Sequence, residues 1–77
     1  MAWIKLNHVG GPIYVNSDQI YNFEKTGVAG ISIYGSSSNV PVTYSFSSSD
    51  EVDEIIAKLE KILKVIDINQ LAIQTEQ

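Results

Sequence analysis

The sequence predicts the α+β class: a curved antiparallel sheet of about five strands, a meander forming a partial barrel, with one C-terminal amphipathic helix. Two observations carry this prediction. Short alternating apolar segments, separated by turn residues, fill the chain before Ser47, and the one long helical pattern comes after it. The 77 residues allow a single domain, 1–77, with a sheet at 2–46, a helix at about 49–66 and a short C-terminal extension at 67–77.

Five segments have the alternation and composition of strands. In the first, Ile4 and Leu6 fall between more polar neighbours, as a half-buried strand requires. The pair Gly10–Gly11 predicts a tight turn before the second. Pro41 cannot donate to a strand ladder, so we expect an edge strand or a bulge at that point. The expected strands are Ala2–Val9, Pro12–Asn16, Gln19–Lys25, Ile31–Tyr34 and Val40–Phe46.

The helix has signals for its start and for its buried side. Ser48 and Glu51 have the spacing of a capping box, acidic residues fill the first turn, and lysines follow in the later turns. The apolar stripe favours packing against the sheet over a coiled coil, because a coiled coil needs three or four heptads and this run supplies about two. The stripe consists of Val52, Ile55, Ile56, Leu59, Ile62, Leu63 and Ile66.

The chain carries more apolar surface than one helix can cover. Apolar residues fall on both faces of the expected sheet, and others continue after a turn expected at Asp67–Asn69, in a short helix or strand at Gln70–Gln74 or in one bent helix. The sequence has no cysteine, so no disulfide stabilises so small a domain. We therefore expect copies of the chain to cover one another. The residues expected to make this interaction are Trp3, Tyr14, Tyr34, Val65, Ile68, Leu71 and Ile73.

Composition and charge exclude several classes of function. The net charge is −4 and the chain has no arginine, so we expect no nucleic-acid partner. No apolar run is long enough to span a membrane, and the first residues have no signal-peptide pattern, so we expect a cytoplasmic protein. No metal or other cofactor is expected, because the acids at Asp50–Glu54 fit the start of a helix. His8 has no nucleophile or carboxylate close in sequence, so we expect no enzyme.

A family resemblance follows from the order of five motifs: an Ile-x-Leu start, a glycine turn, an asparagine-ended strand, an Ile-x-x-Ile-Glu-like strand and a Ser-x-x-Glu-Val helix entry. Between residues 3 and 56 this order resembles the FlbD-like family of small flagellar and swarming-motility accessory proteins. The resemblance implies the strand order and a bacterial protein, and its motifs are structural, not catalytic. Thr26–Gly30 replaces the family's Pro-Asp-Thr turn, and the loop at Gly35–Asn39 is longer. The matching positions are Ile4, Leu6, Gly11, Asn16, Ile20, Glu24, Ile31, Ser48, Glu51 and Val52.

Three functions remain as hypotheses. The first is a small non-enzymatic protein-interaction module that self-associates and has possible further protein partners. The second is a small-ligand binder or enzyme whose site forms between subunits, with His8 and Tyr14 as the first residues to mutate. The third is an acidic regulator of the phage or mobile-element type that binds a basic surface of its partner.

Overall fold

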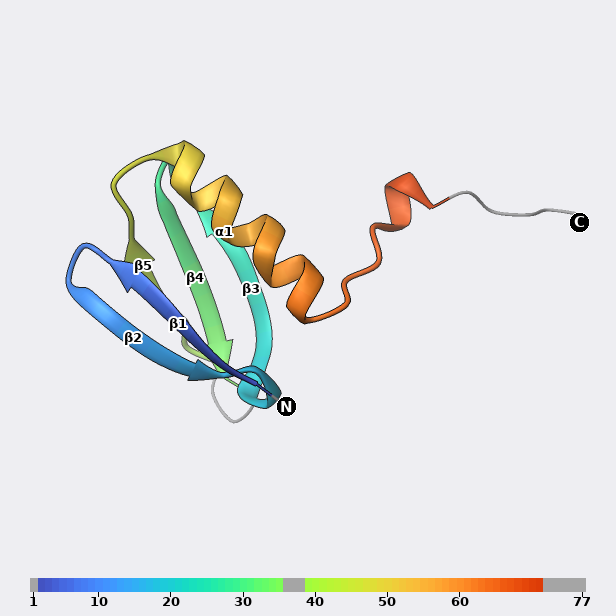
Figure 1. The fold of residues 1–77 in the computed structure, drawn as a ribbon, viewed down its shortest axis with the longest axis horizontal. Helices are drawn as coiled ribbons and strands as arrows, with labels where there is room; N and C mark the ends of the chain where they lie inside the picture. The colour runs from blue at the N-terminus through green and yellow to red at the C-terminus, as the bar shows by residue number, and fades with distance from the viewer. Residues whose placement is uncertain (1, 36–38, 72–77) are drawn as a thin grey trace, which may run out of the picture.

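The structure, a computed structural model, describes residues 2–35 and 39–71 (Figure 1). It has the α+β composition that the sequence predicts, with five antiparallel strands and one α-helix. Single 3-10 turns at Ser17–Gln19 and Ile68–Gln70 complete the regular structure of these residues. The elements are β1 (Trp3–His8), β2 (Gly11–Asn16), β3 (Ile20–Thr26), β4 (Gly30–Gly35), β5 (Val42–Ser45) and α1 (Ser49–Ile62).

The strands form two sheets, whereas the sequence led us to expect one continuous meander. β1 pairs with β2 in a hairpin, and β3, β4 and β5 form a three-stranded antiparallel sheet. The chain changes direction between β2 and β3 because Asn16 Oδ1 accepts a hydrogen bond from the Asp18 N–H at 2.9 Å and starts the 3-10 turn. Ser17 N–H then donates to the Ala2 carbonyl at 2.8 Å, which ties this turn to the start of β1. The strands of the described residues do not close into a barrel.

The hairpin packs over the three-stranded sheet, and α1 lies along one margin of both (Figure 1). Val9 N–H donates to the Ser45 carbonyl at 2.9 Å, so the end of β1 meets the end of β5. Alternate residues of each strand face inward, and the buried side of α1 completes the core. The buried apolar residues are Ile4, Leu6, Ile31, Ile33, Phe46, Val52 and Leu59.

All five strands differ from the expected bounds by one or two residues, and the starts of β3 and β5 have a clear local cause. β3 begins at Ile20, because Gln19 belongs to the preceding 3-10 turn. β5 begins at Val42, one residue after Pro41, and it is an edge strand of its sheet. Pro41 has no N–H to donate, and because it lies just outside the edge strand β5, no hydrogen bond of the ladder is lost. The sequence led us to expect an edge strand at this point.

Helix α1 begins where the sequence predicts. Ser48 is the N-cap, and its Oγ accepts a hydrogen bond from the Glu51 N–H at 3.1 Å. The Glu51 carboxylate reaches back to Ser47, where it accepts from the backbone N–H at 3.1 Å and from the hydroxyl at 2.6 Å. In the usual capping box this carboxylate returns to the cap residue itself. Here it accepts hydrogen bonds from the residue before the cap, Ser47, instead.

The helix ends at Ile62, about one turn before the expected end at residue 66. Lys64 has a left-handed backbone conformation, with φ of 56°. Its N–H donates to the Lys61 carbonyl at 3.3 Å, and the Val65 N–H donates to the Glu60 carbonyl at 2.9 Å. This pair of bonds is the Schellman motif, which closes the last carbonyls of a helix.

Candidate interaction surface

Two of the expected interface residues lie together on the outer face of the hairpin. Trp3 and Tyr14 expose 68% and 62% of their surface. Trp3 pairs with Asn16 and Lys5 pairs with Tyr14 in the β1–β2 register, so the two aromatic side chains are diagonal neighbours on one face. The Lys5 Nζ lies 6.0 Å from the centre of the Tyr14 ring. We call Trp3, Lys5 and Tyr14 the hairpin patch.

Tyr34 is not part of this patch. It is half-buried on β4, in the other sheet, and its cross-strand partner is Asn22. Because side chains alternate along a strand, Tyr34 shares a face with Ser32 and lies on the side opposite to the core residue Ile33. The structure therefore separates Tyr34 from the aromatic residues with which the sequence grouped it.

A second apolar surface lies beyond α1. Residues 65–71, which we call the C-terminal segment, run away from the body of the protein (Figure 1). Four large apolar side chains of this segment are exposed, with exposed fractions between 47% for Val65 and 71% for Ile68. Of the residues expected to interact here, Ile73 lies outside the described residues. The exposed apolar residues of the segment are Val65, Ile66, Ile68 and Leu71.

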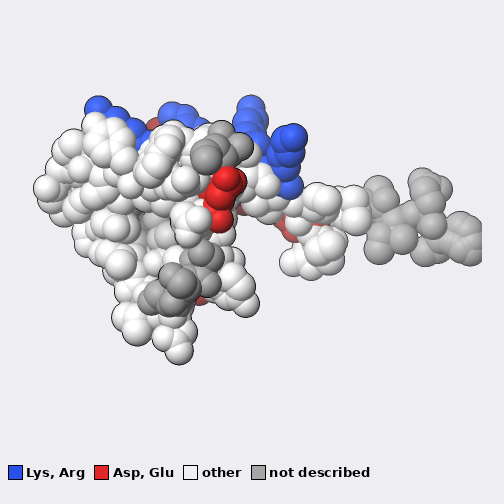
Figure 2. Space-filling view, turned by 90° about the horizontal axis from the view of Figure 1, so that it is seen from below, with Lys and Arg blue, Asp and Glu red and all other residues white. Residues whose placement is uncertain are grey.

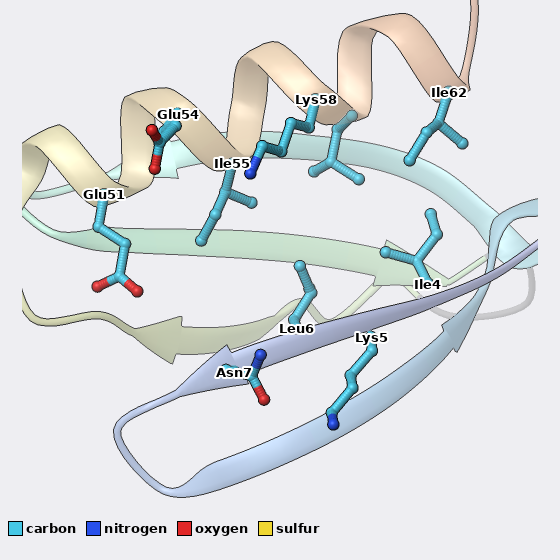
Figure 3. A pocket seen from close by; sticks show the side chains of 10 residues that line it. Ile4, Lys5, Leu6, Asn7, Glu51, Glu54, Ile55, Lys58 and Ile62 are labelled. Carbon is cyan, nitrogen blue, oxygen red and sulfur yellow. The ribbon is translucent and has the colours of Figure 1, made fainter.

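A groove between β1 and α1 is a feature that sequence reasoning missed. It has a volume of about 280 Å³ and is open to solvent (Figure 3). Four consecutive β1 residues line one wall, and α1 residues at helical spacing line the other. The four-residue spacing of Glu54, Lys58 and Ile62 was the sequence signal for this wall, because it places the three residues in one row beside the buried stripe of the helix. The lining residues are Ile4, Lys5, Leu6, Asn7, Glu51, Glu54, Ile55, Lys58, Leu59 and Ile62.

Charges of both signs border the groove. On the α1 wall, Lys58 extends along the helix toward Ile55, and Glu51 and Glu54 lie nearer the start of the helix (Figure 3). The hydroxyl of Ser47, followed by its backbone N–H, holds the pKa of Glu51 below its ordinary value of 4.5. Within the part of the chain that the structure describes, the one salt bridge joins Lys25 to Asp53, so Lys5 and Lys58 have no carboxylate partner.

His8 has a structural setting. Its Nδ1 accepts a hydrogen bond from the Gly10 N–H at 3.1 Å, and its ring meets Tyr44 edge-on with centroids 4.9 Å apart. Tyr14 pairs with Lys5 across the hairpin and shares its face. Lys5 and His8 are separated by an odd number of residue steps along β1, so the His8 and Tyr14 side chains lie on opposite faces of the hairpin. The structure thus does not bring His8 and Tyr14 together.

The described residues contain no group of three or more metal-ligating side chains. None of their helices has the length and apolar character needed to cross a membrane. Comparisons with protein-family models, curated proteins and solved structures give no match. The resemblance to the FlbD-like family therefore stays a prediction.

Proposed function

We propose that the protein is a small non-enzymatic interaction module that self-associates. The observation that carries this proposal is the C-terminal segment, where four large apolar side chains are exposed within seven residues. Each square ångström of apolar surface removed from water contributes about 25 cal/mol. Contiguous exposed apolar surface in a small protein marks an interaction site. Covering this segment is the simplest use of such a surface.

The size of the core supports the same proposal. Seven apolar residues are buried among those that the structure describes, which is a small core, and the sequence has no cysteine that could form a stabilising disulfide. Association with a second copy adds buried apolar surface without changing the fold. Figure 2 shows one face of the protein on which uncharged side chains predominate, with lysines along one margin and one acidic group nearer the middle. The uncharged part of this face can be covered with little desolvation of charge.

The hairpin patch is the second surface available for association. Aromatic residues are enriched at protein interfaces because a large rigid side chain buries much area at low entropic cost. Trp3 and Tyr14 have this character, and Lys5 lies between polar and aromatic neighbours on the same face. We assign the hairpin patch a supporting role, since it holds fewer exposed apolar residues than the C-terminal segment.

Light scattering after size-exclusion chromatography tests the proposal. The full chain at micromolar concentration should elute with a mass above that of one copy, and the mass should fall on dilution. A stable, folded monomer at the highest accessible concentration would contradict self-association.

A further inference from the structure

We propose that the C-terminal segment of one copy binds in the β1–α1 groove of a second copy, as an extended strand beside β1. This inference rests on the proposed self-association and names the two surfaces that produce it. The groove and the segment both belong to this chain, so two copies can exchange segments symmetrically and fill two identical grooves.

The free edge of β1 is the backbone feature that receives the segment. Within the described residues, β1 has one ladder partner, β2, and on its other side Val9 N–H bonds to β5. Backbone groups alternate between the two sides of an antiparallel strand, so Lys5 and Asn7 direct theirs to the same side as Val9. Four consecutive residues of β1 line the groove, which shows that it follows the strand edge. An unpaired edge of this kind is a template for an added strand.

The residue pattern of the segment matches that of β1. In β1 the buried Ile4 and Leu6 flank the exposed Lys5. In an extended C-terminal segment Ile66 and Ile68 would share one face and flank Asp67 on the other. This alternation holds in either strand direction. The added strand would therefore continue the apolar inner face with two isoleucines and the polar outer face with one carboxylate.

Charge favours the same alignment. Asp67 is the one charged residue of the segment, and Lys5 lacks a carboxylate partner within the described residues. Asp67 of the bound segment, placed beside Lys5, would offset the positive charge of the two lysines that line the groove, Lys5 and Lys58. The volume of about 280 Å³ accommodates aliphatic side chains entering from an extended segment. It is at the lower limit of what encloses a small-molecule ligand.

The helix end directs the segment to a different copy. The Schellman bonds from Lys64 and Val65 fix the direction of the chain after α1, and that direction leads away from the groove of the same copy (Figure 1). The segment itself holds one 3-10 turn, in which the Asp67 carboxylate accepts from the Asn69 N–H at 3.0 Å. These bonds are exposed to solvent, so opening the turn into an extended strand costs little free energy.

A double variant in the segment and a control variant outside it test the role of the segment. The double variant Ile66→Asn, Ile68→Asn should raise the dissociation constant of the dimer by at least about tenfold, because two aliphatic side chains leave the interface. Val28→Asn is the control, since Val28 is 78% exposed in the β3–β4 turn and lies outside both surfaces. Sedimentation equilibrium measures all three chains, and circular dichroism checks that each is folded. A dimer unaffected by the isoleucine substitutions would overturn this inference and leave self-association intact.

Cysteine cross-linking tests the position of the segment, because the chain has no cysteine of its own. K5C on one chain and D67C on a second, differently tagged chain should give a disulfide-linked heterodimer under mild oxidation. The pair K5C with V28C should not. If the chain that carries both K5C and D67C closes the bond within one copy, the segment occupies its own groove and the exchange between copies is wrong. If every chain is a monomer in sedimentation, the proposed function itself is wrong.

Discussion

The Lys25 Nζ lies 2.9 Å from Asp53 Oδ1 and joins the edge strand β3 to the start of α1. The same ammonium group donates to Ser49 Oγ at 2.9 Å, so one lysine binds two residues of the first helical turns. The contact spans 28 residues of sequence. It fixes the helix over the edge of the three-stranded sheet, and through the helix it positions one wall of the groove.

Replacing Lys25 with methionine should lower the free energy of unfolding by about 0.2–1 kcal/mol, since the pair is partly exposed and its attraction is screened. Asp53→Asn should cost a similar amount, and the double variant should cost less than the sum of the two. Urea unfolding at low and high salt measures these values. A double variant whose loss equals the sum would show that the two side chains do not interact.

The stability of the protein should depend on pH through Glu51. Its pKa is lowered in the folded state by the Ser47 hydrogen bonds, so its contribution is present above the ordinary value of 4.5 and is lost as the pH falls through the lower folded value. Glu51→Gln should therefore be less stable than the natural chain at about pH 6, with the gap closing as the pH falls below the ordinary value of 4.5. Glu54→Gln controls for the loss of one charge on the same helix. A gap that stays constant over this range would contradict the assignment.

Lys64→Gly should raise the free energy of unfolding by about 1 kcal/mol. Lys64 has a φ of 56°, a conformation that glycine adopts without the steric cost of a Cβ. Lys64→Ala keeps the Cβ and should give no comparable gain. Thermal and urea unfolding of both variants measure the difference. Equal stability of the glycine and alanine variants would mean that the backbone at this residue is not left-handed.

Ser32 is the one buried polar residue among those that the structure describes; it is 3% exposed and lies on the face of β4 opposite to Ile33. Its hydroxyl lies 2.6 Å from the Thr26 hydroxyl and 2.8 Å from the Thr43 hydroxyl, which links β3, β4 and β5 across one face. Ser32→Ala should cost about 1 kcal/mol, because two threonine hydroxyls lose a partner. Thr43→Val removes only one of the two contacts and should cost less. An alanine variant as stable as the natural chain would show that water replaces the serine hydroxyl.

The sequence was informative wherever a residue's local role was unambiguous. Ser48 and Glu51 located the start of α1 because capping depends on a few neighbouring residues. Alternation in β1 placed Ile4 and Leu6 in the core, and Pro41 marked the limit of an edge strand. The two-sheet arrangement was not predictable in this way, since it depends on a 3-10 turn whose closing bonds join Ser17 to Ala2, 15 residues away.

The end of α1 shows the limit of periodicity. Ile66 continues the apolar stripe seven residues after Leu59, and this periodicity placed the helix end too late. Adjacent β-branched residues, Val65 and Ile66, lower helix propensity, and Lys64 is not a residue that usually marks a Schellman cap. The groove was missed for a related reason, because it needs β1 and α1 side by side. Only the tertiary arrangement supplies that information.

Self-association of the full chain is best measured by sedimentation equilibrium over a range of micromolar concentrations, because this method reports mass without a label or a substitution. We expect a mass that rises toward twice the chain mass of 8.5 kDa, and a mass closer to that of one copy at the same concentrations when Ile66 and Ile68 are both replaced by asparagine. A single-copy mass for the natural chain at every concentration, with the fold intact by circular dichroism, would contradict self-association.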